Sequence, residues 1–193
     1  MPAIAKVTKE MIIDAAFEIA KEMGAENITA RTVSQKLGCS TQPVLYHFKT
    51  IEDVRIAAHK KASEFHMNYV TNLSGKYERP MLEVGMRYIQ FAVEEKNLFR
   101  FLYHSCYDTG VSLSDWLTGK NFDSLFPILK RQANVDEQQA YSIFSQIVLV
   151  THGIASLHAN NAMVYDEAYC IKALSNAYFG IMCLIKERDL NGR

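Results

Sequence analysis

The sequence has few cysteines, and it has no net charge. The four cysteines, at positions 39, 106, 170 and 183, form no CxxC pair, whereas a secreted disulfide framework needs closer and denser spacing. The 21 basic residues balance 21 acidic residues, which disfavours a protein that is covered with nucleic acid. We therefore expect a cytoplasmic chain whose functional charges are local.

The sequence also lacks a long uninterrupted apolar run. The N-terminus has no apolar signal core, and polar residues interrupt the most apolar stretch, 143–157. These residues are Ser145, Gln146, Thr151, His152 and Ser156. We predict neither export nor a membrane-spanning helix.

Motifs of catalysis and metal binding are missing as well. There is no Gly-rich phosphate loop, no nucleophile elbow and no carboxylate pair spaced for acid–base chemistry, so we expect no enzyme and no cofactor. The six histidines include no HxxxH pair, and His104 and Cys106 would diverge on a helix, so we expect no metal site. His59 and His66 share a helix face and either respond to pH or ligand or simply pack.

Helical periodicity runs through the whole chain, of which 49% is apolar, and it predicts an all-α fold. We expect a first helix from Thr8 to Gly24, two short helices within 28–48, and a long helix over 51–73. Further helices are expected at 81–96, 98–107, 122–133, 136–159 and 165–187, with a less regular piece at 112–117. The predicted domains are a head, 1–50, and a larger body, 51–193.

The two short helices have clear start and stop signals. Thr29 is a suitable cap for the first, and Gly38 ends it in a left-handed conformation. Ser40 is a suitable cap for the second, and Pro43 falls in its first turn, where a backbone N–H is not needed. The pattern predicts a helix-turn-helix.

The second short helix has one face for packing and another for recognition. At 100° per residue Val44 and Phe48 share a face, and Gln42, Pro43 and Tyr46 lie opposite them. Six basic and two acidic residues between positions 28 and 61 give this segment a charge of +4. A rigid probe in a positive field is typical of a major-groove reader.

This segment resembles the TetR family of bacterial transcriptional regulators. The matching residues are Ile28, Thr29, Arg31, Val33, Leu37, Gly38, Cys39, Ser40, His47, Phe48 and Lys49. Leu45 and Ile51 stand where many members have Tyr and a basic residue, both associated with phosphate contacts. Tyr46 points about 100° away from the expected Tyr, so it contacts a different phosphate or a base.

Nine residues are our candidates for DNA contact. We expect Gln42 to read adenine, Pro43 to touch a thymine methyl, and Lys49 to bind phosphate. Arg31, at the start of the first short helix, is expected to reach a phosphate or a guanine edge. The full set is Thr29, Arg31, Ser40, Thr41, Gln42, Pro43, Tyr46, His47 and Lys49.

The last two long helices are strongly apolar, and the resemblance implies that they form a four-helix interface in a homodimer. A dimer would read a near-palindromic operator. The resemblance also implies a cavity in the body for a small effector. Because the body is rich in aromatic residues, we expect this effector to be apolar or aromatic. Candidate wall residues are Tyr103, His104, Trp116, Gln146, His152 and His158. The body further resembles a subgroup with a Trp-His-Gly signature, with Thr151 in place of the Trp.

The resulting expectation is a dimeric DNA-binding regulator, a repressor that a small molecule releases from its operator. A second interpretation stays open. The chain is then a helical adaptor for a protein partner or a hydrophobic ligand, and the head attaches to DNA only non-specifically.

Overall fold

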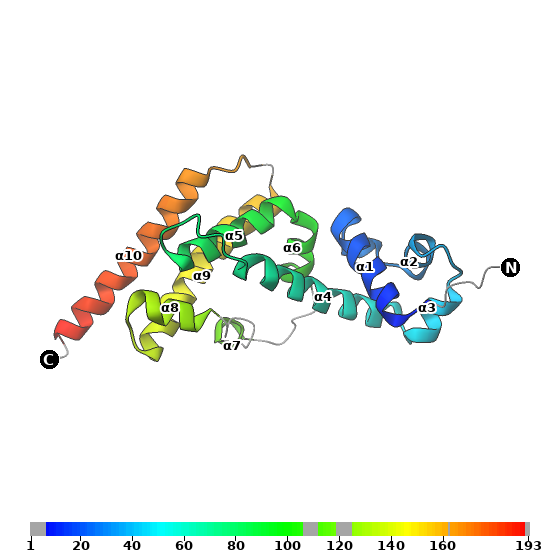
Figure 1. Ribbon diagram of the computed structural model, residues 1–193, viewed down its shortest axis with the longest axis horizontal. Coiled ribbons are helices and arrows are strands. Elements are labelled where there is room, and N and C mark those ends of the chain that lie inside the picture. Colours follow the sequence, from blue (N-terminus) through cyan, green and yellow to red (C-terminus); the bar gives the residue numbers. More distant parts are fainter. Residues whose placement is uncertain (1–6, 106–111, 119–124, 162, 192–193) are drawn as a thin grey trace. The chain divides into compact units, whose positions relative to one another are not determined.

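The computed structural model describes residues 7–105, 112–118, 125–161 and 163–191. All regular elements of these residues are helices (Figure 1), which confirms the all-α prediction. The N-terminal helices are α1 (Lys9–Met23), the 3-10 turn η1 (Ala25–Asn27), α2 (Ala30–Lys36), α3 (Gln42–His47) and α4 (Ile51–Thr71). They are followed by α5 (Pro80–Glu94), α6 (Lys96–Tyr103), α7 (Leu113–Thr118), α8 (Phe126–Ala133), α9 (Glu137–Asn160) and α10 (Glu167–Asn191).

The chain divides into two compact units. Unit 1 is formed by residues 1–67 and 95–108, and unit 2 by residues 68–94 and 109–193. The division falls inside α4 and places α6 with the helix-turn-helix, whereas the motif alone suggested a boundary at residue 50. Contacts made by α6 within unit 1 account for this difference.

In unit 1, α6 packs on α1. The side-chain amide of Asn97 donates to the Lys21 carbonyl oxygen at 3.0 Å, and the Lys21 ammonium lies 2.8 Å from the Glu95 carboxylate. Leu98 and Phe99 are fully buried. Burial of two large apolar side chains contributes several kcal/mol, about 1.5–3 kcal/mol each, so α6 is part of the core of unit 1.

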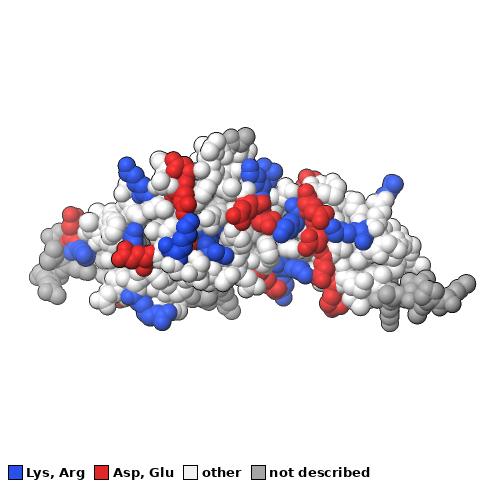
Figure 2. All heavy atoms as spheres, turned by 45° about the horizontal axis from the view of Figure 1, so that its top comes forward, with Lys and Arg blue, Asp and Glu red and all other residues white. Residues whose placement is uncertain are grey.

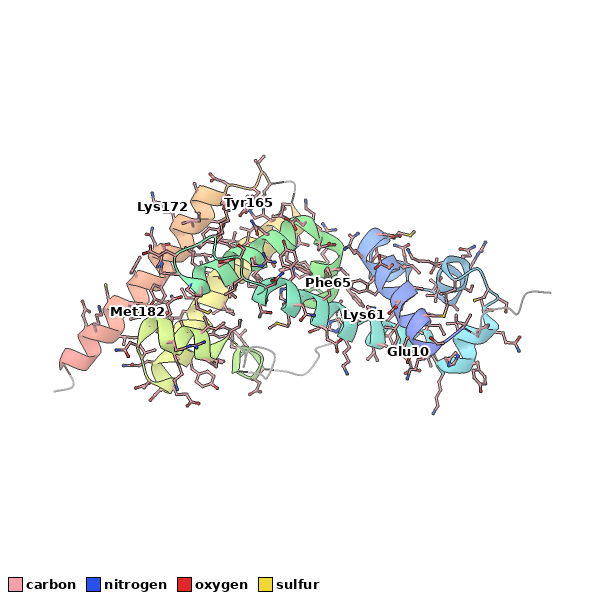
Figure 3. All side chains as sticks on the ribbon, in the orientation of Figure 1. Glu10, Lys61, Phe65, Tyr165, Lys172 and Met182 are labelled. Carbon is pink, nitrogen blue, oxygen red and sulfur yellow. The ribbon has the colours of Figure 1, made fainter. Side chains whose placement is uncertain are left out.

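Helix α4 also packs on α1. Lys61 and Phe65 project from α4 in Figure 3. Lys61 forms an ion pair with Asp14, and the Phe65 ring meets the edge of Phe17 with centroids 5.5 Å apart. The part of α4 that belongs to unit 1 is thereby fixed to the helix that supports the helix-turn-helix.

Unit 2 is built on α5, α8, α9 and α10. Its core contains Val84, Leu129, Ile143, Phe144 and Ile181, one or more from each of these helices. Helix α9 begins with a capping box in which Asp136 and Gln139 exchange hydrogen bonds with each other's backbone N–H, which satisfies two donors of the first turn. The predicted helix 136–159 is confirmed.

Gly85 permits a close approach of helices in unit 2. A Cβ atom at this position would lie 2.9 Å from Leu174 Cδ1 and 3.8 Å from Thr151 Oγ1. Thr151 is buried, and its hydroxyl donates to the Ile147 carbonyl at 2.7 Å. Thr151 is therefore a packing residue, and the likeness to the Trp-His-Gly subgroup stays a prediction.

Two predicted elements differ in the structure. Residues 113–118, expected to be irregular, form helix α7, because Ser112 caps it by accepting from the Asp115 N–H at 3.1 Å while its hydroxyl donates to the Asp115 carboxylate. The helix expected over 98–107 ends at Tyr103, and positions 106 and 107 lie outside the described residues.

Helices α9 and α10 leave much of their apolar surface uncovered. Both are long and apolar enough to cross a membrane by length and composition alone, and only 28% and 22% of their most apolar windows are buried. The exposed side chains include Leu149, Val150 and Leu157 on α9 and Phe179 and Leu184 on α10. Surface of this kind marks an interaction site.

Candidate DNA-binding surface

The start of α2 is fixed by a capping box of two threonines. The Thr29 hydroxyl accepts from the Thr32 N–H at 3.1 Å, and the Thr32 hydroxyl accepts from the Thr29 N–H at 3.0 Å. The Thr32 hydroxyl also donates to the Asn27 carbonyl at 2.6 Å. The predicted cap is confirmed, and it sets the position of exposed Arg31 two residues later.

The turn between α2 and α3 follows from Gly38, which adopts φ +65° as predicted. Its N–H donates to the Gln35 carbonyl, and the Cys39 N–H donates to the Ser34 carbonyl at 3.0 Å. These bonds satisfy carbonyl groups at the end of α2. The turn is therefore held by backbone atoms, and its conformation favours glycine at position 38.

The prediction that Ser40 caps α3 is wrong. Thr41 is the N-cap, with φ −71° and ψ −15°, and its side chain makes no capping hydrogen bond. An N-cap whose side chain bonds to the helix has extended backbone, whereas Thr41 already has helical angles. Ser40 and Thr41 are both exposed, and Pro43 lies in the first turn as predicted.

Helix α3 is held by its inner face. Val44 and Phe48 are 1% and 6% exposed, and the Lys9 ammonium lies over the Phe48 ring at 5.1 Å. On the outer side Leu45 is 56% and Tyr46 82% exposed. Six residues gain little helical stability by themselves, so burial of the inner face must hold this helix in place.

His47 makes contact within unit 1. Its Nε2 atom lies 3.0 Å from the Val7 carbonyl oxygen, and its ring meets the edge of Tyr46 at 5.2 Å. The ring is half-buried. His47 thus ties the end of α3 to the segment before α1, which leaves only Nδ1 for any contact with DNA.

Ion pairs reduce the positive charge that the sequence concentrates in this segment. Lys36 pairs with Glu22 at 2.9 Å, Lys61 pairs with Asp14, and Arg55 lies 3.3 Å from Glu52 while donating twice to the Ile28 carbonyl. Figure 2 shows basic and acidic side chains interspersed on the face in view. Pairing therefore leaves fewer cations for phosphate than the sequence count suggests.

Arg31, Lys49 and Lys60 are exposed, and none of them forms an ion pair with another described residue. Arg31 follows the Thr29 cap of α2, and Lys49 comes two residues after the end of α3. Arg31 and Lys49 thus flank α3 along the chain, which is where phosphate contacts that position a reading helix are needed.

Two of the predicted effector residues lie in unit 1. The Tyr103 hydroxyl is 3.3 Å from His66 Nδ1, and burial lowers the pKa of His66 to about 3. His104 lines a cavity of about 570 Å³, together with residues of η1, α4 and α6 that include Arg55 and Phe101. Tyr103 is not among the residues that line this cavity.

Three predicted effector residues lie on α9 in unit 2. His152 Nδ1 is 2.8 Å from the hydroxyl of buried Tyr88, and His158 is buried with its ring 5.9 Å from that of Tyr165. Gln146 is exposed and donates to the Ser142 carbonyl. The side chain of Trp116 lies outside the described residues.

The sequence pattern does not single out Tyr88, because an aromatic residue at helical spacing is usually a core residue. Its hydroxyl brings a polar group into the apolar region between α5 and α9. His152 lies 64 residues further along the chain, so no local pattern in the sequence indicates this partnership. Among the described residues, no group of three or more His, Cys, Asp or Glu side chains is placed to hold a metal ion.

Comparison with known proteins identifies the architecture. No family model and no curated protein sequence matches the chain. A tetR-family transcriptional regulator from Streptomyces coelicolor superposes with a TM-score of 0.72 at 14% identity, over 93% of this chain and 83% of that one. The multidrug binding protein EbrR, solved with imidazole, superposes with a TM-score of 0.54 at 19% identity, over 87% of this chain and 93% of that one. The chain therefore has the fold of the TetR-family transcriptional regulators.

Proposed function

We propose that the chain is a ligand-responsive transcriptional regulator that acts in the cytoplasm and not an enzyme. The observation that carries the proposal is the construction of α3. Its inner face is buried through Val44 and Phe48, its outer face exposes Leu45 and Tyr46, and unpaired Arg31 and Lys49 flank it in the chain. A short helix held this way is suited to enter a major groove.

The exposed residues divide into two roles. Arg31 and Lys49 bind phosphates and fix the register of the head, with Thr29, Ser40 and the free Nδ1 of His47 as neutral contributors. Thr41, Gln42, Pro43 and Tyr46 face base edges, where an amide matches the donor and acceptor of adenine. Substitution in the first group should weaken binding to all sequences, and substitution in the second should change base preference.

The regulator acts as a homodimer through α9 and α10. Exposed apolar side chains on these two helices support this assignment, because a monomer would leave them in water. Two recognition helices then read a near-palindrome whose half-sites lie roughly one helical turn, about 34–36 Å, apart. Two half-sites approximately add their binding free energies.

An apolar or aromatic small molecule releases the dimer from DNA. In unit 2 the hydrogen-bonded pair of Tyr88 and His152 offers a polar anchor within an apolar body, which is the composition of a ligand cavity. Helix α4 contributes residues to both units, so a change in its position couples effector to operator. If the effector's binding free energy differs by about 3 kcal/mol between the two conformations, operator binding is weakened more than a hundredfold.

Selection of binding sites from a pool of randomised duplexes tests the proposal. The regulator should enrich an inverted repeat, and Gln42→Ala should enrich a less restricted repeat with the same spacing. Met23→Glu, which adds a charge at an exposed position outside the two contact groups, serves as a matched surface control and should enrich the same repeat as wild type. Enrichment of no sequence by the wild-type protein would contradict the proposal and favour a helical adaptor.

A further inference from the structure

The recognition helix carries no residue that reads guanine well. Its sequence is Gln-Pro-Val-Leu-Tyr-His, and its only ionisable cation, His47, is bonded through Nε2 to the Val7 carbonyl. Guanine presents two acceptors in the major groove, and arginine or lysine is their usual partner. Arg31 and Lys49, the flanking cations, lie outside α3. The helix thus lacks the group for the commonest specific contact to a G·C pair.

The exposed surface of α3 is instead largely apolar. Leu45 is 56% exposed and Tyr46 is 82% exposed, and half-buried Pro43 lies on the same outer part of the helix. The thymine 5-methyl group is the apolar feature that the four bases present in the major groove. Gln42, which is exposed at the start of α3, carries the amide that pairs with adenine, the complement of thymine. Both features favour the same base pair.

We infer that α3 recognises an A·T core in each half-site and that the isobutyl group of Leu45 packs against a thymine methyl. The inference rests on the proposed function and specifies its DNA target. Leucine has no group that binds phosphate, so the exposed side chain of Leu45 suits an apolar group on the DNA. Its exposure on the outer face is explained when a methyl group covers it on binding.

Replacement of thymine by uracil isolates the methyl contact. Uracil keeps every hydrogen-bonding group of thymine and lacks only the 5-methyl. In the duplex enriched by selection, each half-site should contain one thymine whose replacement weakens binding about fourfold, the equivalent of ~0.8 kcal/mol for one buried carbon group. A G·C core, or equal binding of every uracil-substituted duplex, would overturn the inference.

A Leu45→Ala variant assigns the contact to its side chain. Because Leu45 is exposed, the variant should fold with unchanged circular dichroism, and the fourfold uracil penalty should disappear in it. Leu113→Ala removes a leucine of similar exposure, 60%, from α7 and should keep the penalty. A penalty that persists in Leu45→Ala would overturn the role of this residue.

Failure of the thymine-methyl contact can be distinguished from failure of the proposed function. If wild-type protein enriches a defined repeat that tolerates uracil throughout, thymine-methyl recognition is wrong and the regulator function stands. If it enriches no sequence at all, the regulator function is wrong, and the inference is overturned with it.

Discussion

At the scale of single residues, ion pairs separate the cations near the motif, because Lys36 and Lys61 pair with acids whereas Arg31 and Lys49 pair with no described residue. Six basic residues lie between positions 28 and 61, and the helix-turn-helix pattern selected Arg31 and Lys49 among them as candidates. Lys36 and Lys61 pair with acids that lie 14 and 47 positions earlier, and sequence periodicity does not reveal such pairs. Arg31 and Lys49 are exposed, and no ion pair with another described residue competes with their binding to phosphate.

Arg31→Ala and Lys49→Ala should each weaken DNA binding and flatten its salt dependence. Each substitution removes one phosphate contact per protomer, so the slope of log K against log salt should become shallower by about 2 per dimer, at roughly 0.9 per contact. Titration by fluorescence anisotropy at several salt concentrations measures this. Lys172→Ala removes the same charge from α10 (Figure 3) and should leave the slope unchanged. A slope that is unchanged in all three variants would show that neither Arg31 nor Lys49 contacts phosphate.

At the scale of elements, local signals predicted more than long-range ones. The helix starts at Thr8 and Thr29 were readable because each of these caps bonds to a residue three positions on. The cap of α3 was misassigned to Ser40 because two adjacent hydroxyl residues are equivalent in sequence and only the backbone angles distinguish them. The place of α6 in unit 1 depends on contacts to Lys21, 76 residues away from Asn97, which no local pattern encodes.

Glu83→Gln should destabilise unit 2 by opening the turn between α4 and α5. The buried carboxylate accepts from the Ser74 hydroxyl at 2.8 Å and from the Gly75 N–H at 3.0 Å. Burial raises the pKa of Glu83, but these hydrogen bonds outweigh it and leave the pKa below its ordinary value. We expect a loss of about 2 kcal/mol at pH 7, measured by urea unfolding.

The pH dependence of this loss has a definite sign. A lowered folded-state pKa contributes stability that is present above the ordinary value of 4.5 and is lost as pH falls through the folded-state pKa. The difference in free energy of unfolding between wild type and Glu83→Gln should therefore decrease as the pH falls. Glu78→Gln, at an exposed position nearby, should change stability little, and an equal effect of both variants would contradict the turn's dependence on Glu83.

His66→Asn should remove a component of acid sensitivity from unit 1. Burial lowers the pKa of His66 from 6.5 to about 3, so the folded state keeps a neutral ring while the unfolded chain takes up a proton below pH 6.5. The free energy of unfolding of wild type should decrease by ~2 kcal/mol between pH 6.5 and pH 5 because of this group. Urea unfolding at both pH values should show that the free energy of unfolding of wild type falls by that amount relative to the variant. A difference that does not change with pH would indicate that His66 titrates alike in the folded and unfolded states.

At the scale of the whole molecule, recognition of a near-palindromic operator depends on a dimer. The sequence predicted that α9 and α10 carry more apolar residues than one body covers, and Leu157 and Leu184 are 53% and 54% exposed. The effector site was less predictable, because its candidate residues are distributed between unit 1 and α9 and an aromatic core resembles an aromatic cavity in sequence. The Tyr88–His152 pair joins residues 64 positions apart.

Leu184→Glu should convert the dimer to a folded monomer. A charge at this exposed position costs the protomer little but is unfavourable when buried without a partner. Sedimentation velocity should show half the mass of wild type. Met23→Glu places the same charge at a position with the same exposure, 54%, on α1 and should remain dimeric. A Leu184→Glu protein that stays dimeric would place the interface elsewhere.

A titration followed by fluorescence anisotropy measures whether the protein recognises a specific DNA sequence. Purified protein is titrated onto the DNA upstream of its own gene and onto a scrambled duplex of equal length, at two salt concentrations. We expect a preference of at least about a thousandfold for the upstream fragment, maintained at the higher salt. Equal and steeply salt-sensitive binding to both duplexes, or binding to neither, would contradict it.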